Sequence, residues 1–144
     1  MELNEEIQKK IIEIRMLEDQ IGQMEERVRL IDREILELQN IILSLDELTD
    51  VDDKEAMVPI GKNVFVKSKV NNCNEVYVNI GSKTIVKKTI IEAKKLFEEK
   101  KDKFLEAREY IGTDADKIIK RIGKVDSEIM DIQNKINIKQ NAEK

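Results

Sequence analysis

This 144-residue sequence contains no histidine and no tryptophan, and it contains only one cysteine and one proline. Without histidine, Cys73 has no imidazole to activate it as a nucleophile, and the commonest general base of enzymes is missing. A single cysteine also excludes an intrachain disulfide and fits a reducing compartment. No apolar run is long enough to span a bilayer, and the charged start MELNEEIQKK is unlike a signal peptide. We therefore expect a soluble, cytoplasmic protein that is not an enzyme and does not contact membranes.

Ligand-binding motifs are also scarce. The GSKT at residues 81–84 is similar to the end of a phosphate-binding loop, but the upstream glycine is missing at the required spacing. Asp50, Asp52 and Asp53 are more typical of a turn than of a metal site, so we expect no metal and no cofactor. Lysines are frequent in residues 94–103, but acidic residues are interleaved with them and the net charge is −4. This pattern is typical of a solvated helix face and argues against a nucleic-acid partner.

Charged residues, in contrast, make up 39% of the chain, whereas aromatic residues make up 3%. This composition is typical of long helices and coiled coils. From Leu3 to Leu48 the apolar residues keep a seven-residue repeat with 3-4 spacing, which predicts a helix packed along a left-handed seam. Lys10 is the one polar residue in these two columns. The columns are Ile7, Ile14, Ile21, Val28, Ile35 and Ile42, and Leu3, Lys10, Leu17, Met24, Ile31, Leu38 and Leu45.

A second repeat begins at Ile90 and predicts a second long helix. Its columns align antiparallel with those of the first helix if the residue numbers of partners add to about 139, although a shift of one heptad also fits. Residues 1–48 carry 13 acidic and 6 basic side chains, whereas residues 90–144 carry 12 and 13. An acidic helix gains more from a neutral, lysine-rich neighbour than from a copy of itself. The two helices are therefore expected to pair with each other.

Between the helices, residues 57–89 alone favour β-structure. Four runs rich in β-branched residues, at 57–61, 64–70, 75–80 and 84–88, are separated by turn residues at 61–63, 71–74 and 81–83. This spacing predicts two β-hairpins. Isolated hairpins are marginally stable in water, so these strands need partners from other chains. The apolar residues expected in such an oligomerisation surface are Met57, Val58, Ile60, Val64, Phe65, Val66, Val70, Val76, Val78, Ile80, Ile85 and Val86.

A mainly α chain with a long antiparallel coiled-coil hairpin and two small β-hairpins at its bend resembles the prefoldin family, specifically its alpha-class subunits. The most specific stretch is VPIGKNVFVKSKVNNCNEVYVNIGSKTIVKKT at residues 58–89. Beta-class subunits carry one β-hairpin, whereas four strand runs are visible here. The resemblance implies one prefoldin-like domain, with residues 1–48 as the first helix, 49–89 as the oligomerisation platform and 90–144 as the second helix.

The resemblance also implies a function. Strands of several prefoldin subunits join into an intersubunit β-barrel platform, and the coiled-coil tips hold unfolded proteins without ATP and pass them to a group II chaperonin. The partners would be beta-class subunits in a mixed hexamer, or copies of the chain itself in a filament. Both assemblies stay open at this point, and so does a structural scaffold that binds no unfolded protein.

The free end of the coiled coil suits such a role on physical grounds. Helix ends fray, so seam residues there are poorly covered, and several weakly binding tips can act together. Ile11, Ile12 and Met16 lie outside both heptad columns, and they either widen this surface or contact a neighbouring subunit. The residues expected to bind unfolded chains are Leu3, Ile7, Ile11, Ile14, Ile129, Ile132, Ile136 and Ile138.

Overall fold

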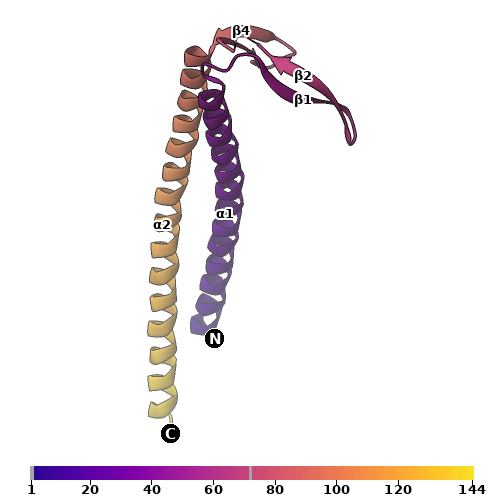
Figure 1. The fold of residues 1–144 in the computed structure, drawn as a ribbon. Coiled ribbons are helices and arrows are strands. Elements are labelled where there is room, and N and C mark those ends of the chain that lie inside the picture. The colour runs from indigo at the N-terminus through magenta and orange to yellow at the C-terminus, as the bar shows by residue number, and fades with distance from the viewer. Residues whose placement is uncertain (1, 72) are drawn as a thin grey trace. The chain divides into compact units, whose positions relative to one another are not determined.

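A computed structural model describes residues 2–71 and 73–144. The elements are helix α1 (Glu2–Leu48), strands β1 (Lys54–Gly61), β2 (Val64–Val70), β3 (Glu75–Asn79) and β4 (Ile85–Thr89), and helix α2 (Ile90–Ala142), as labelled in Figure 1. The predicted mainly α fold with two β-hairpins is confirmed. Met1 and Asn72, the latter in a predicted turn, lie outside the described residues. The chain divides into two compact units, residues 1–32 with 106–144 and residues 33–105, which are described in turn.

The first unit is a pair of helical segments. Val125 is fully buried, and the exposed fractions of Ile129 and Ile132 are 7% each. Three ion pairs connect the segments: Lys10 Nζ with Glu128 Oε2 at 2.7 Å, Arg108 Nε with Asp32 Oδ1 at 2.6 Å, and Arg121 Nη2 with Glu13 Oε1 at 2.8 Å. The residue numbers add to 138, 140 and 134, and the first two sums agree with the predicted value of about 139. Gly112–Asp116, a possible bend in the sequence, lies within uninterrupted helix.

The second unit has a small core where the helices meet the strands. Leu45, Val78, Ile90 and Ala93 are buried together, and Leu48, Val76, Leu96 and Phe97 pack against them. Ala93 has no exposed surface, which fits a position where only a small side chain leaves room for its neighbours. Lys94 forms an ion pair with Asp46 beside this core. The core therefore joins the end of α1, the start of α2 and strand β3.

The strands form two separate two-stranded antiparallel sheets, β1–β2 and β3–β4. Strand β1 begins at Lys54, three residues before the predicted run, because Lys54, Glu55 and Ala56 pair with Val70, Lys69 and Ser68. A register shift follows Pro59, and Asn63 adopts a left-handed φ of 63° in the turn. In the β3–β4 turn, Gly81, Ser82 and Lys83 all have positive φ. Each strand therefore pairs on one edge only, and the single chain contains no closed barrel among its described residues.

Candidate functional site

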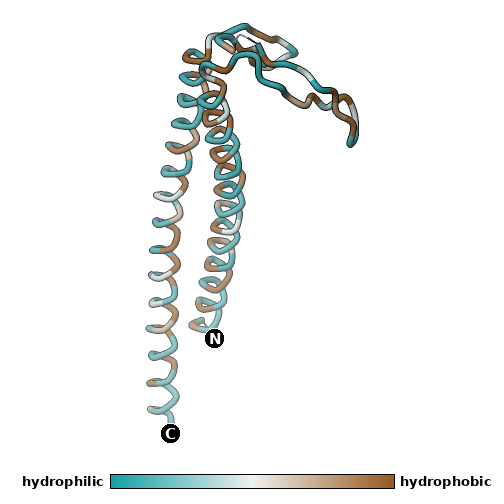
Figure 2. The backbone as a smooth tube through the Cα atoms, viewed as in Figure 1, coloured by the Kyte–Doolittle hydropathy of each residue, from teal (hydrophilic) through white to brown (hydrophobic). Residues whose placement is uncertain are grey.

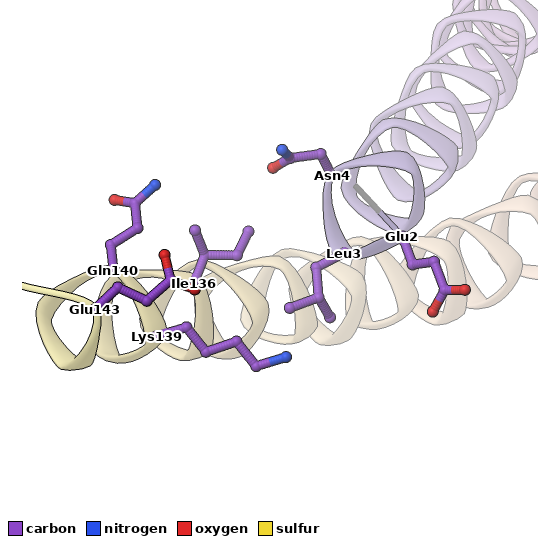
Figure 3. A pocket seen from close by; sticks show the side chains of 7 residues that line it. All are labelled: Glu2, Leu3, Asn4, Ile136, Lys139, Gln140 and Glu143. Carbon is purple, nitrogen blue, oxygen red and sulfur yellow. The ribbon is translucent and has the colours of Figure 1, made fainter.

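The end of the first unit that contains Glu2 and Glu143 holds a cavity of about 510 Å³. Its walls come from the first turn of α1 and the last turns of α2, and Figure 3 shows the side chains around it. Leu3 and Ile136 contribute apolar surface, whereas Glu2, Lys139 and Glu143 contribute charged groups. The opening is therefore amphipathic rather than uniformly apolar. The lining residues are Glu2, Leu3, Asn4, Ile136, Lys139, Gln140 and Glu143.

The eight residues predicted to bind unfolded chains fall into three groups by exposure. Ile129 and Ile132 are buried in the helix pairing, and Leu3, Ile7, Ile14 and Ile136 are half-buried. Ile11 is 39% exposed and Ile138 is 68% exposed. Ile12 and Met16, which lie outside the heptad columns, are also exposed, as is Met130, which the heptad pattern does not single out. Exposed apolar surface near this end is thus supplied mainly by residues outside the heptad columns.

The Lys10–Glu128 pair shapes the electrostatics of this end. Lys10 occupies a seam position, and its ammonium group donates a hydrogen bond of 2.7 Å to the Glu128 carboxylate. This hydrogen bond raises the pKa of Lys10 above its usual 10.5 and lowers the pKa of Glu128 below its usual 4.5. Both groups therefore stay charged throughout the neutral range. A charged pair in an apolar seam favours one alignment of the helices over alternatives shifted along the axis.

The β1–β2 hairpin exposes most of the residues predicted for oligomerisation. Met57, Val58 and Ile60 of β1 and Val64, Phe65 and Val66 of β2 are all exposed. Figure 2 shows apolar residues recurring along both strands of this hairpin. In the described residues, no third strand pairs with this sheet. Such a concentration of exposed apolar residues is typical of surfaces that bind another protein.

The β3–β4 hairpin is covered on one face. Val78 is buried in the core of the second unit, and Val76 and Val86 are half-buried, so these residues stabilise the single chain. Ile80, Ile85 and Tyr77 remain exposed. Val70 at the end of β2 is half-buried. The sequence pattern did not distinguish these environments, because both hairpins contain several β-branched residues.

The described residues contain no group of three or more acidic, histidine or cysteine side chains arranged to hold a metal ion. Across those same residues, neither helix is long and apolar enough to cross a membrane. The cavity beside the core of the second unit, about 440 Å³ in volume, is lined by Asp46, Thr49, Asp50, Asn74, Thr89, Ile90, Ile91 and Lys94.

Comparisons with known proteins point in one direction. Residues 13–135 match the family described as prefoldin subunit. The chain is 33% identical over 112 residues to prefoldin subunit alpha of Methanobrevibacter smithii, covering 73% of this chain and 77% of that protein. It is 27% identical to the Pyrococcus horikoshii prefoldin subunit alpha, covering 92% and 90%. A cryo-EM structure of filamentous PFD from Methanocaldococcus jannaschii has the same fold, with a TM-score of 0.70 and 23% identity over 80% of this chain and 96% of that chain.

Proposed function

Because the chain belongs to the prefoldin subunit family, we propose that it is an ATP-independent holdase subunit. It captures unfolded proteins at the open end of its helix pair and passes them to a group II chaperonin in the cytoplasm. Prefoldin is a non-enzymatic chaperone family, and the chain is not an enzyme. The observation that carries the proposal is the exposed apolar surface of Ile11, Ile12, Met16, Met130 and Ile138 in the first unit.

Client binding by this surface depends on many weak apolar contacts. An aliphatic side chain contributes about 1.5–3 kcal/mol when it is fully buried, and less in a mobile contact. One helix end therefore binds an unfolded segment weakly and without a strict sequence requirement. Several ends around one client bind more tightly through their effective concentration. This function requires an oligomer, and the uncovered hairpins provide the surface for one.

Two assemblies are compatible with this function. In the first, β-strand edges of the chain join those of beta-class subunits in a mixed hexamer with a β-barrel platform. In the second, copies of the chain associate alone and propagate as a filament, and the fold shared with a filamentous archaeal protein favours keeping this candidate. Light scattering of the purified chain, alone and with a beta-class subunit, separates them, because only the filament grows without the second chain.

The holdase proposal is tested by shortening the helix pair. A variant lacking residues 1–10 and 133–144 retains both hairpins and the core of the second unit, and we expect it to form the same oligomers. We expect it to lose most of its ability to suppress aggregation of a chemically denatured protein diluted into buffer. The matched control is Leu30→Ser, which removes an exposed leucine of α1 away from that end. Undiminished protection by intact oligomers of the shortened chain would contradict client binding and leave a structural scaffold.

A further inference from the structure

Two uncovered surfaces in the second unit are chemically complementary. The first is one face of the β1–β2 hairpin. Directly paired residues share a face, and faces alternate along a strand, so Met57 and Lys67 lie on the same face as Phe65 and Lys69. Met57 is 70% exposed and Phe65 is 57% exposed. Glu55 and Pro59 lie on this face as well. We call this surface, with its apolar residues, two lysines and one glutamate, the hairpin face.

The second surface is an apolar stripe on α1 that is not part of the heptad seam. Leu36 is 57% exposed and Leu43 is 60% exposed. Leu36, Leu43 and Glu47 follow one another at seven and four residues, which places them on one side of a helix. The seam residues Ile35, Leu38 and Leu45 are buried in the same segment, so the stripe lies outside the helix pairing. We call it the α1 stripe.

The hairpin face carries Lys67 and Lys69 with one carboxylate, Glu55, whereas the charged residue of the α1 stripe is Glu47. The segments around them differ in the same sense. No acidic residue occurs between Glu55 and Glu75, whereas Lys62, Lys67 and Lys69 lie in that interval. Residues 33–48 carry one arginine, Arg33, and four acidic side chains: Glu34, Glu37, Asp46 and Glu47. Within the chain, Lys67 pairs with Glu55 at 3.1 Å and Lys69 pairs with Asp53 at 3.2 Å, with all four side chains mostly exposed. Such surface pairs contribute little, so exchanging them for pairs with another molecule costs little.

The spacing of the two surfaces also agrees. Phe65 and Lys67 lie two residues apart on a strand, a distance of about 6.6 Å. Leu43 and Glu47 lie four residues apart on a helix, a distance of about 6 Å along its axis. If Leu43 of one copy packs on the ring of Phe65 of another copy, the side chains of Lys67 and Glu47 therefore lie close to each other.

We propose that copies of this chain associate by packing the hairpin face of one copy on the α1 stripe of the next. The inference deepens the proposed function, because it assigns one contact between like subunits to named residues. The two surfaces are different parts of the chain, so the contact is heterologous: each copy offers a free hairpin face and a free stripe. The opposite face of the hairpin, with Val58 and Val66, and the strand edges remain available to the β-barrel platform.

The test is self-association of the purified chain, measured by light scattering over a range of concentrations. We expect Leu36→Ser with Leu43→Ser to weaken association tenfold or more, because two leucines lose their burial. Leu30→Ser, an exposed leucine of α1 in the other unit, is the matched control and should leave association unchanged. Circular dichroism melting of the variants at low concentration verifies that the helices remain folded.

A charge exchange makes the test specific. We expect Glu47→Lys and Lys67→Glu each to weaken association about two- to fivefold, since each places like charges together. Both changes in one chain should restore association to near the original level. A Lys67→Gln variant provides a milder change that avoids repulsion between residue 67 and Glu55 within the hairpin.

The outcomes separate the two proposals. The proposed contact is wrong if the chain is monomeric at every concentration, or if it associates equally well without Leu36 and Leu43. In either case a different kind of chain would have to cover these surfaces. Client holding is measured separately on the shortened helix pair, so it can fail while this contact survives. Additive losses from the two charge changes, without restoration in the combined variant, also overturn the contact.

Discussion

The two β-hairpins of this chain have similar compositions and different structural roles. The β3–β4 hairpin places Val78 in a core with Leu45, Ile90 and Ala93, so it is part of the folded chain. The β1–β2 hairpin has an equally apolar sequence, but Val58, Val66 and Phe65 remain exposed. The comparison teaches that β-branched residues predict a strand without indicating which molecule covers it. One hairpin is stabilised from within the chain, and the other keeps its apolar side chains exposed.

The largest expected effect comes from a change in the core that packs against the β3–β4 hairpin. Leu45→Ala should lower the free energy of unfolding by about 2–5 kcal/mol, because it leaves a cavity between α1 and strand β3. Urea unfolding followed by circular dichroism at low protein concentration measures this loss. An unfolding free energy within about 0.5 kcal/mol of the original would show that the core beside β3 does not stabilise the chain.

A smaller, paired change compares the hairpins directly. Val78→Thr and Val58→Thr exchange a methyl group for a hydroxyl of similar size in each sheet. Val78→Thr should lower the free energy of unfolding by about 1–2 kcal/mol, since the hydroxyl is buried. Val58→Thr should change it by less than about 0.5 kcal/mol, because the side chain is exposed in the single chain. Thermal melting at low concentration measures a loss of folding, and light scattering at high concentration measures a loss of assembly. If both substitutions lowered the free energy of unfolding equally, the two hairpins would not differ in their contribution to the fold.

The smallest effect concerns the ion pair in the helix seam of the first unit. The lowered pKa of Glu128 means that its contribution is present at neutral pH and is lost as pH falls through that pKa, below 4.5. The raised pKa of Lys10 means that its contribution is lost only as pH rises above 10.5. Glu128→Gln should therefore lower the melting temperature by about 1 °C at pH 7 and by less at pH 3.

The control for this prediction is Glu25→Gln, an exposed carboxylate of α1 without an ion pair among the described residues. It should not change the melting temperature at either pH. A loss at pH 3 as large as that at pH 7 would mean that residue 128 acts through packing rather than through charge.

Much of the fold could be predicted from the sequence, because period 3.5 and period 2 are properties of short segments. The heptad columns place Ile35, Leu38 and Val125 in buried positions, and the turn residues separate the strands correctly. The start of β1 at Lys54 was missed, because polar residues on a hairpin edge have no β pattern. The register of the helices was left with two solutions, since a heptad repeat matches itself after seven residues, and the ion pair between Lys10 and Glu128 distinguishes them.

The candidate sites could be predicted less well. The sequence predicts the same role for Ile129, Ile132 and Ile138, but the first two are buried and the last is exposed. The position of a residue in the sequence gives its distance from the end of the helix. Its exposure depends in addition on whether its side chain lies on the face that the partner helix covers. The sequence pattern does not predict a role for Leu36 and Leu43. They lie outside the seam columns, and single exposed leucines are common on protein surfaces, so only their shared exposure in the structure connects them.

The outer edges of β1 and β2 have a consequence for how the chain is produced. A two-stranded ribbon whose outer backbone donors and acceptors have no strand partner among the described residues can pair with strands of other chains. A surplus of this polypeptide over its assembly neighbours would therefore accumulate as aggregates. We therefore expect that aggregation is avoided either by synthesis balanced with that of its assembly partners or by rapid degradation of unassembled copies.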